Sequence, residues 1–161
     1  NTGLPPQDIM SKLNNAVTEG NETGMFITMF VGQLNLATGQ LAYCNAGHNP
    51  IVVVEPDSTE AHFLDAKPNL AAGVFQDFPY ELQHCSLQHG SRLIVYTDGV
   101  TEAERTDKTL FGNERLLTWA ATADRYHGAK EACEGLLAEI QAFAQGNEQN
   151  DDITIMTIKY K

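Results

Sequence analysis

The chain has 161 residues, of which 42% are hydrophobic and 19% are charged, and its formal net charge at pH 7 is −11. Its length is enough for one domain with a hydrophobic core. The excess of acidic residues argues against binding to nucleic acid or to an anionic membrane, because phosphate contacts need Lys and Arg. The same charge suits a protein that holds divalent cations, although a solvated acidic surface has this composition too.

No part of the sequence is apolar over the length that a membrane-spanning helix needs, and no secretory signal is recognisable at its start. The longest apolar runs are short, such as 51–54 and 93–96. The three cysteines, Cys44, Cys85 and Cys133, are far apart and follow no metal-binding spacing, which favours a reducing compartment. We therefore predict a cytoplasmic domain, which can also be the cytoplasmic part of a larger, membrane-anchored protein.

The first third of the chain predicts a helix followed by strands. Two prolines and a helical spacing of apolar residues predict a helix over 5–20. The continuous apolar run 25–31 predicts a strand buried on both faces. A hairpin loop at 35–40 leads to a second strand over 41–45, and a third strand follows over 51–55.

The rest of the chain predicts short strands and then two helices. The predicted elements are a short strand at 61–64, strands at 80–85 and 92–96, a helix over 113–126 capped by Asn113, a longer helix from Gly128 to Gly146, and a last strand at 153–160. Strands cluster in the first two thirds and helices lie at both ends. This order favours an α+β fold with mainly antiparallel sheets over alternating βαβ units.

Two acidic sites stand at the ends of predicted strands. Asp98 follows the strand at 92–96 and precedes Gly99, and Asp151 and Asp152 precede the last strand. If these strands are antiparallel neighbours, the end of one and the start of the other lie at the same sheet edge, so the carboxylates meet. Such oxygen ligands suit Mg²⁺ or Mn²⁺. An Asp-Gly turn and an acidic loop end are equally ordinary, so the residues alone leave both interpretations open.

His48 lies in the loop 45–50 between two predicted strands. A histidine in a turn is more often structural than catalytic, and no nucleophilic triad or zinc-type spacing accompanies it. No glycine-rich nucleotide loop is present either. We therefore place His48 no closer than the edge of a functional site.

Six segments occur in an order that identifies a family. They are Met25–Phe30 (MFITMF), Tyr43–Pro50 (YCNAGHNP), Leu70–Val74 (LAAGV), Tyr96–Ala103 (YTDGVTEA), Phe111–Leu116 (FGNERL) and Asp151–Thr154 (DDIT). Together they resemble the metal-dependent protein phosphatase (PPM, protein phosphatase 2C-like) superfamily. Within it they resemble the bacterial serine phosphatases of the sporulation stage II protein E and sigma-factor-regulator class. The resemblance extends over nearly the whole chain.

The resemblance implies an αββα four-layer β-sandwich of mainly antiparallel sheets flanked by helices. It implies two Mn²⁺ or Mg²⁺ ions at one end, which activate a water for in-line attack on phosphoserine or phosphothreonine. By the same resemblance, Asp98 and Asp151 are metal ligands, Asp152 orients a ligand or a water, and Gly99 lets the backbone turn tightly beside the metal. His48 stands where the wider superfamily often has an Asp that holds a third metal, so we expect no third site there.

One segment of the family has no counterpart in the sequence. The family carries an Asp-Val-x-Gly-x-Gly segment upstream, whose Asp bridges both metals. We therefore expect residues 1–161 to be the C-terminal two thirds of a single phosphatase domain, truncated at its N-terminus. Because two divalent cations repel unless an anion lies between them, we expect one weak metal site or none, and little or no hydrolysis by this chain alone. Sheet edges exposed by the truncation predict a homodimer.

The family also implies partners. The expected substrate is a phosphorylated protein of the anti-sigma-factor antagonist type, and the expected regulator is an upstream sensor or receiver domain in the parent chain. We expect no nucleic acid partner. Two alternatives stay open: a non-catalytic pseudophosphatase that binds a partner protein, and an unrelated α+β domain whose motifs match by accident.

Overall fold

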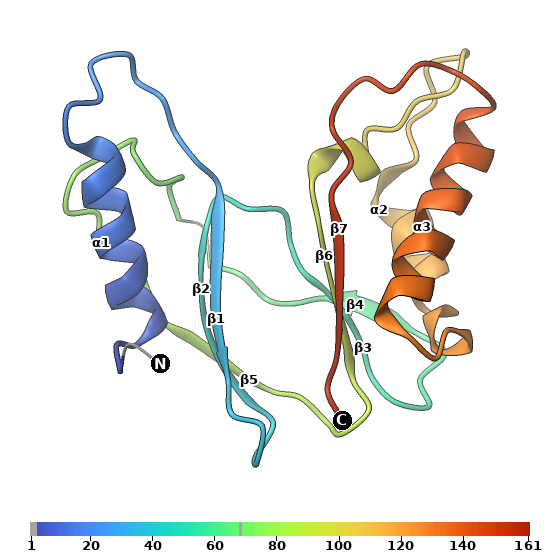
Figure 1. Ribbon diagram of the computed structural model, residues 1–161, viewed down its shortest axis with the longest axis horizontal. Coiled ribbons are helices and arrows are strands. Elements are labelled where there is room, and N and C mark those ends of the chain that lie inside the picture. The colour runs from blue at the N-terminus through green and yellow to red at the C-terminus, as the bar shows by residue number, and fades with distance from the viewer. Residues whose placement is uncertain (1–2, 68) are drawn as a thin grey trace. The chain divides into compact units, whose positions relative to one another are not determined.

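A computed structural model describes residues 3–67 and 69–161. The chain divides into two compact units, each with its own antiparallel sheet (Figure 1). The first unit comprises Asn1–His48 and Asp65–Leu87, and the second comprises Asn49–Leu64 and Gln88–Lys161. Both units are therefore assembled from segments that are discontinuous in the sequence.

In the first unit one helix covers a three-stranded sheet. The helix α1 (Pro6–Thr18) packs against β1 (Met29–Leu34) and β2 (Gln40–Ala46). The strand β5 (Gln83–Ser86) pairs with the other edge of β2, which gives the order β1-β2-β5. Proline at the first helical position suits α1, because its missing N–H would have no partner there. The centre of this core consists of Met10, Cys44, Ala46 and Tyr80.

The strand predicted over 25–31 is wrong in its start and in its burial. The strand begins at Met29, and the side chains of Met25 and Phe26 are 68% and 61% exposed. Before Met29, the pairing is limited to an isolated bridge between Ile27 and Ala72. Among the strands of the described residues, β2 alone pairs with β1, so β1 is an edge strand of its sheet. An apolar run by itself does not reveal how many of its faces are covered.

The second unit contains a four-stranded antiparallel sheet in the order β4-β3-β6-β7. Its strands are β3 (Val52–Val54), β4 (Ala61–Phe63), β6 (Arg92–Tyr96) and β7 (Ile155–Lys159). The interior strands β3 and β6 are the most apolar of the four and are almost completely buried. Their β-branched side chains suit a pleated surface that is covered by neighbours.

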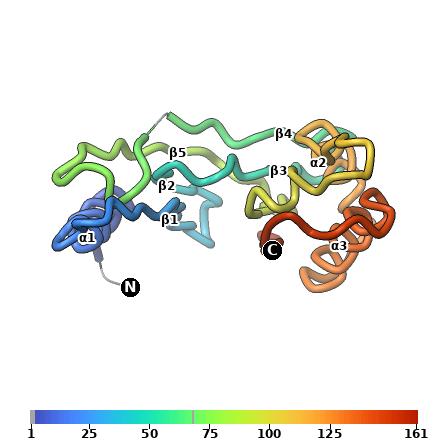
Figure 2. The backbone as a smooth tube through the Cα atoms, turned by 90° about the horizontal axis from the view of Figure 1, so that it is seen from above, coloured from blue at the N-terminus to red at the C-terminus, as the bar shows by residue number. Residues whose placement is uncertain are grey.

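Two helices lie on the same side of this sheet (Figure 2). The helix α2 (Gly112–Ala120) contacts β3 and β4, and α3 (Ala129–Ala144) contacts β7. Short 3₁₀ helices, η1 (Asp98–Val100) and η2 (Ala123–Arg125), follow β6 and α2. The buried side chains that join helices to sheet include Ile94, Tyr96, Leu116, Trp119, Leu136, Ile140 and Phe143.

The predicted helix over 113–126 is wrong at both ends. Its N-cap position is Phe111, so Asn113 lies inside the helix, and the helix ends at Ala120. Phe111 is buried and packs edge-on against Phe143 with ring centroids 5.4 Å apart, so tertiary packing decides where this helix begins. The predicted opening of α3 after Gly128 is confirmed.

The predicted fold class, α+β with mainly antiparallel sheets and helices, is confirmed. Each helix belongs to a unit whose sheet it covers. Within the described residues, no helix is both long and apolar enough to cross a membrane.

Candidate functional site

The two acidic sites predicted from the sequence meet at one edge of the second sheet. β6 and β7 are antiparallel neighbours, and their register pairs Tyr96 with Ile155. The chain therefore leaves β6 where it enters β7. One step beyond the sheet, the backbone N–H of Thr97 still donates to the carbonyl of Thr154 at 3.1 Å. The antiparallel arrangement, on which the metal hypothesis depended, is confirmed.

The hydroxyl of Thr97 joins the two loops that carry the acidic residues. Its Oγ1 donates to the carbonyl oxygen of Asp152 at 2.8 Å. The same oxygen accepts the backbone N–H of Thr154 at 2.9 Å. One side chain thus fixes the loop after β6 against the loop before β7 through two hydrogen bonds.

Gly99 permits the backbones of these loops to touch. A Cβ atom at this position would lie 2.6 Å from the carbonyl oxygen of Asp152 and 3.1 Å from that of Asp151. A contact of 2.6 Å is shorter than Cβ atoms make in proteins, so one of the two loops would have to shift. The tight turn expected here is present as η1, which begins at Asp98. The need for glycine comes from the neighbouring loop, which leaves no room for a side chain.

The carboxylates of Asp98 and Asp151 are held in the same way. Oδ1 of Asp98 accepts the N–H of Gly99 at 3.1 Å, and Oδ1 of Asp151 accepts the N–H of Asp152 at 2.7 Å. Both side chains are exposed to solvent. Hydrogen bonds among the described residues use only one oxygen of each carboxylate. The other oxygen of each carboxylate is therefore accessible to a ligand from solvent.

These donors suit one hard divalent cation. Mg²⁺ is commonly bound through one or two carboxylates while it keeps several waters. The part of the chain that the structure describes contains no group of three or more His, Cys, Asp or Glu residues placed to hold a metal. Asp98 and Asp151 thus fit a single, largely hydrated ion, and the described residues do not supply a two-metal cluster. The ligand role of both residues stays a prediction.

Asp152 and His48 have less direct positions. The carbonyl of Asp152 accepts the Thr97 hydroxyl, while its side chain is exposed, so its proposed role in orienting a ligand stays a prediction. His48 belongs to the first unit and is partly buried. Its backbone N–H donates to Asn45 Oδ1 at 2.8 Å, and its carbonyl accepts Asn45 Nδ2 at 2.9 Å. The Asn45 side chain therefore fixes the backbone of the loop that presents this histidine.

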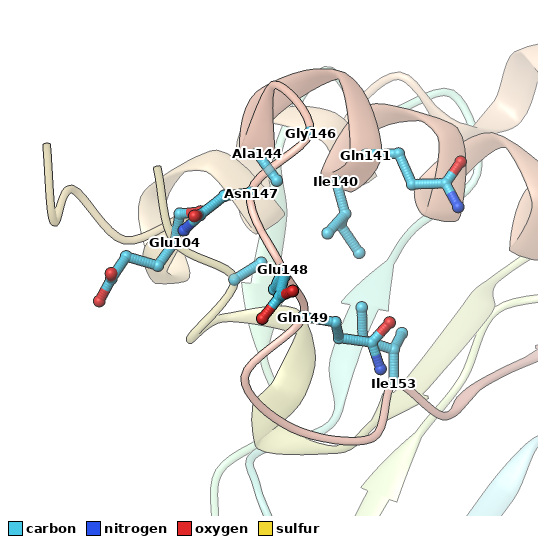
Figure 3. A pocket seen from close by; sticks show the side chains of 10 residues that line it. Glu104, Ile140, Gln141, Ala144, Gly146, Asn147, Glu148, Gln149 and Ile153 are labelled. Carbon is cyan, nitrogen blue, oxygen red and sulfur yellow. The ribbon is translucent and has the colours of Figure 1, made fainter. Parts of the chain in front are cut away.

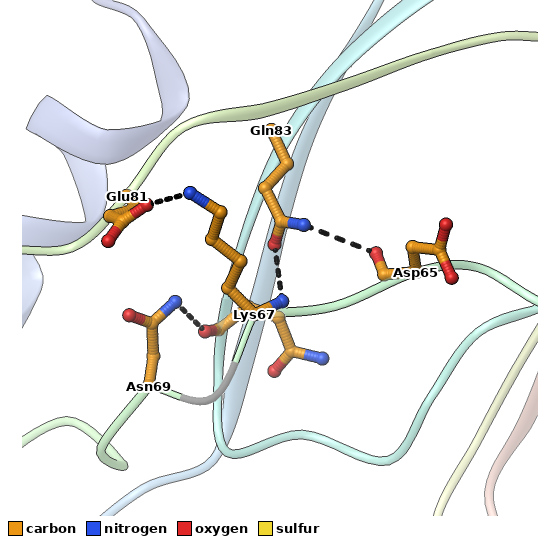
Figure 4. A network of polar contacts seen from close by, with 6 residues as sticks. Asp65, Lys67, Asn69, Glu81 and Gln83 are labelled. Carbon is orange, nitrogen blue, oxygen red and sulfur yellow. Dashed lines mark hydrogen bonds and ion pairs between the residues drawn. The ribbon is translucent and has the colours of Figure 1, made fainter.

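A polar network around residues 65–67 and 69, in the segment after β4, contacts the loop that carries His48 (Figure 4). Asn69 Nδ2 donates to the carbonyl of Asn45 at 2.9 Å. Lys67 forms an ion pair with Glu81, and its backbone N–H donates to Gln83 Oε1 at 2.9 Å. Because the ion pair is exposed, it adds little to stability, and the hydrogen bonds to backbone atoms are what define this loop.

A cavity of about 230 Å³ borders the loop that leads to Asp151. Its lining includes Glu104, Ile140, Asn147, Glu148, Gln149 and Ile153 (Figure 3). Gln149 connects the cavity with the acidic edge, because its Nε2 donates to the carbonyl of Asp151 at 2.7 Å. Asn147 Nδ2 donates to the carbonyl of Glu104 at 3.0 Å and holds the two walls together. Apolar and amide side chains share the interior.

The sequence interpretation missed Thr97 and Gln149. Thr97 lies inside the segment YTDGVTEA, directly before Asp98, but a threonine at a strand end has no signature of its own. Gln149 lies in a polar loop with no pattern at all. The partners of Thr97 lie 55 and 57 residues away in the sequence, and the role of Gln149 depends on the geometry of its loop, so neither role is visible in the periodicity of the sequence.

The fold is that of the PP2C-type phosphatase domains. A solved structure of the PP2C phosphatase domain and a fragment of the regulatory domain of SpoIIE from Bacillus subtilis superposes with a TM-score of 0.76, at 18% identity, over 98% of this chain and 46% of that one. At that identity the likeness establishes the fold alone.

The sequence comparisons define the family. The model for stage II sporulation protein E (SpoIIE) matches residues 1–161, and the chain belongs to this family. It is 28% identical over 163 residues to the phosphoserine phosphatase RsbU of Bacillus subtilis. That alignment covers 99% of this chain and 47% of RsbU. It is 30% identical over 141 residues to the protein IcfG of Synechocystis, which covers 88% of this chain and 22% of IcfG. The chain thus spans less than half of the length of both relatives.

Proposed function

We propose that this chain is part of a metal-dependent protein phosphatase domain that hydrolyses phosphoserine or phosphothreonine on a regulatory protein. The observation that carries the proposal is the meeting of the Asp98 and Asp151 loops at one sheet edge, in a chain of the SpoIIE family. The related RsbU is named a phosphoserine phosphatase. The structure of RsbX, which has a similar fold, was determined in complex with magnesium.

A bound Mg²⁺ or Mn²⁺ would supply an activated water and would neutralise charge on the phosphoryl group. Asp98 and Asp151 would hold the ion through the oxygen atoms that their own loops leave unused. Thr97 and Gly99 keep the two loops at a fixed separation before any ion binds, so little reorganisation would be needed. The exposure of both carboxylates leaves the edge open to a phosphorylated side chain of another protein.

The substrate we propose is a phosphorylated protein of the anti-sigma-factor antagonist type. The names of RsbU and RsbP, which are both phosphoserine phosphatases, support phosphoserine as the group that is hydrolysed. An upstream sensor or receiver region would regulate the domain, as the regulatory fragment in the solved SpoIIE structure suggests by analogy. The exposed apolar side chains of Met25 and Phe26 beside the edge strand β1 support the predicted homodimer.

The second candidate function is a pseudophosphatase that binds a partner without catalysis. It is favoured by one observation: among the described residues, no group of three or more potential metal ligands comes together. A cytoplasmic location and one weakly bound metal ion or none in this chain alone also belong to the leading proposal.

The test measures Mn²⁺ binding to the chain by calorimetry and Mn²⁺-dependent hydrolysis of a phosphoserine peptide by the full-length protein. Asp98→Asn removes a proposed ligand charge. Asp57→Asn is the matched control, because it removes the same charge from an exposed turn with a left-handed backbone that Asn tolerates. That turn follows β3, whose register pairs Val54 with Arg92, so it lies at the opposite end of the sheet from Asp98.

We expect Asp98→Asn to abolish Mn²⁺ binding and to lower kcat by at least about a hundredfold, because it removes an anionic ligand of the reacting centre. Asp57→Asn should change neither quantity. Mn²⁺ binding without hydrolysis in the full-length protein would favour the pseudophosphatase. Equal Mn²⁺ binding by wild type and Asp98→Asn would refute the metal site itself.

A further inference from the structure

A groove along α2 brings together charged side chains that the proposed phosphatase site does not use. It has a volume of about 360 Å³. Its lining consists of Arg115, Thr118, Trp119, Thr122, Arg125 and Glu139. The first four follow helical spacing on one face of α2 and the turn after it, while η2 supplies Arg125 and α3 supplies Glu139. The groove therefore lies wholly inside the second unit.

Arg115 is exposed and is positioned at this groove by contacts that use only part of its guanidinium. Nη1 donates to the carbonyl oxygens of Leu110 and Phe111 at 3.1 and 3.2 Å. The guanidinium carbon lies 4.8 Å from the centroid of the Phe143 ring. An arginine has five N–H donors, so these contacts leave several of them for another acceptor.

Arg125 is held in a similar way. Its Nη2 donates to the hydroxyl of Tyr126 at 3.0 Å, and its guanidinium carbon lies 4.9 Å from that ring. Neither Arg115 nor Arg125 takes part in any of the ion pairs found within the described residues. In a chain with a net charge of −11, two neighbouring arginines without an ion-pair partner among the described residues are unexpected.

Unpaired buried donors lie close to the same tyrosine. Trp119 is 5% exposed and stacks on Tyr126 with ring centroids 5.8 Å apart, and its indole N–H has no acceptor among the described residues. Arg92 is completely buried and donates through Nη2 to the carbonyl of Tyr126 at 2.7 Å. Its Nε and Nη1 also lack an acceptor in the described part of the chain. Because a guanidinium stays charged even when it is buried, Arg92 adds to the positive potential around Tyr126.

We propose that this groove binds an oxyanion, a phosphate or carboxylate group, on a ligand whose remaining part occupies the rest of the groove. The guanidiniums of Arg115 and Arg125 are the donors, since charge-assisted bonds from arginine to such anions are strong and directional. The hydroxyls of Thr118 and Thr122 donate to helix carbonyls, so they offer no further donor. The negative charge of Glu139 repels a bound anion and so lowers the affinity of the groove. Removal of this charge should therefore strengthen binding.

Trp119 is the single tryptophan of the chain, so its fluorescence reports on this groove. The experiment titrates inorganic phosphate at neutral pH with EDTA present and NaCl added to hold ionic strength constant. EDTA removes divalent cations, so phosphate cannot bind through a metal at Asp98 and Asp151. The readout is therefore independent of the proposed phosphatase activity.

We expect a saturable change in Trp119 emission. Arg125→Gln should weaken phosphate binding roughly tenfold, because it removes a charged donor. Glu139→Gln should strengthen binding, because it removes a repelling charge. Lys130→Gln is the matched control: it removes one positive charge from α3 at a side chain that is 87% exposed and outside the groove, and it should leave the affinity unchanged.

The proposal fails if phosphate produces no saturable change, or if Arg125→Gln and Lys130→Gln weaken binding equally. Equal weakening would reveal a general charge effect. If Arg125→Gln lowers the urea midpoint enough to leave the chain partly unfolded, Arg125→Lys replaces it. That variant keeps the charge and loses the planar fork, so it should bind with intermediate affinity, and affinity at or above wild type would also overturn the proposal.

Discussion

Thr97, through its hydroxyl, and Gly99, through its lack of a side chain, position the acidic loops of the second unit against each other. Asp98 and Asp151 each bond to the amide of the next residue, so neither carboxylate links the two loops. The link is the Thr97 hydroxyl on the Asp152 carbonyl, together with the close approach that Gly99 allows. A site built in this way is organised before an ion enters it.

A methyl group at Gly99 should therefore disturb the acidic edge. Gly99→Ala would place a Cβ atom 2.6 Å from the carbonyl oxygen of Asp152, so the loop before β7 must move. We expect the free energy of unfolding to fall by about 1 to 3 kcal/mol, as for other overpacked sites. Mn²⁺ affinity should fall as well, because the displaced loop carries Asp151. Urea unfolding and calorimetric Mn²⁺ titration measure the two effects.

Gly128→Ala serves as the control for Gly99→Ala. Gly128 has an ordinary backbone conformation, and the nearest atom to an added Cβ lies 3.8 Å away in the flexible side chain of Glu131. Its N-cap position makes some loss of stability expected, but Mn²⁺ affinity should stay unchanged. Wild-type Mn²⁺ affinity in Gly99→Ala would contradict the role assigned to the loop contact.

At the scale of elements, the packing of α3 against Tyr126 depends on Gly135. A glycine inside a helix normally costs about 1 kcal/mol relative to alanine. Here a Cβ atom would lie 2.3 Å from the Tyr126 hydroxyl oxygen. Tyr126 is stacked on Trp119, so it cannot move aside without disturbing a buried aromatic contact. The close approach of the tyrosine explains why α3 contains this glycine.

We therefore expect Gly135→Ala to lower the free energy of unfolding by about 1 kcal/mol, against the gain in helix propensity. Urea unfolding measures the sign, and a change in Trp119 emission should accompany it. In a Tyr126→Ala background the same substitution should be stabilising, because the clash is absent. A Gly135→Ala variant more stable than wild type would show that Tyr126 moves without cost.

At the scale of the whole molecule, both units bury acidic groups in their neutral form. Burial raises the pKa of the Cys44 thiol in the first unit to about 11. Burial likewise raises the pKa of Tyr96 in the second unit to about 12. The pKa values of Tyr43 and Tyr80 are also raised, mainly by burial. Each of these groups favours the folded state only while it keeps its proton.

Stability should therefore decline in alkaline solution. The unfolded chain loses the Cys44 proton near pH 9, whereas the folded chain keeps it to about pH 11, so unfolding releases a proton between these values. Below pH 9 the protonated thiol of Cys44 contributes its full share to the free energy of unfolding, about 2 to 3 kcal/mol. This share is lost as the pH rises from 9 to about 11. Tyr96 acts similarly between pH 10 and about pH 12.

Urea midpoints measured at intervals from about pH 8 to pH 11 check this prediction. Cys44→Ala should start from a lower stability, because it leaves a small cavity, and should then decline less steeply with pH. Parallel curves for wild type and Cys44→Ala would show that the thiol does not contribute to the alkaline loss.

The sequence predicted the helices α1 and α3, the strand β6 and the meeting of Asp98 with the Asp151 loop. These succeeded because local periodicity and the position of acidic residues at strand ends report on neighbouring structure. The sequence-based predictions failed for the strand over 25–31 and for the helix cap at Asn113. In those cases a strand's partners and the burial of Phe111 decided the outcome, and both depend on residues far away in the chain.

By itself, the sequence determined the fold class, the family motifs and the acidic residues of the candidate site, because each can be recognised from local composition and spacing. Only the tertiary structure decided that the Thr97 hydroxyl joins the two acidic loops and that Gly99 is required by a neighbouring backbone. It also decided that two arginines with no ion pair among the described residues share a groove with Trp119. These are contacts between segments joined only by folding, and their distances are set by packing, which no local pattern encodes.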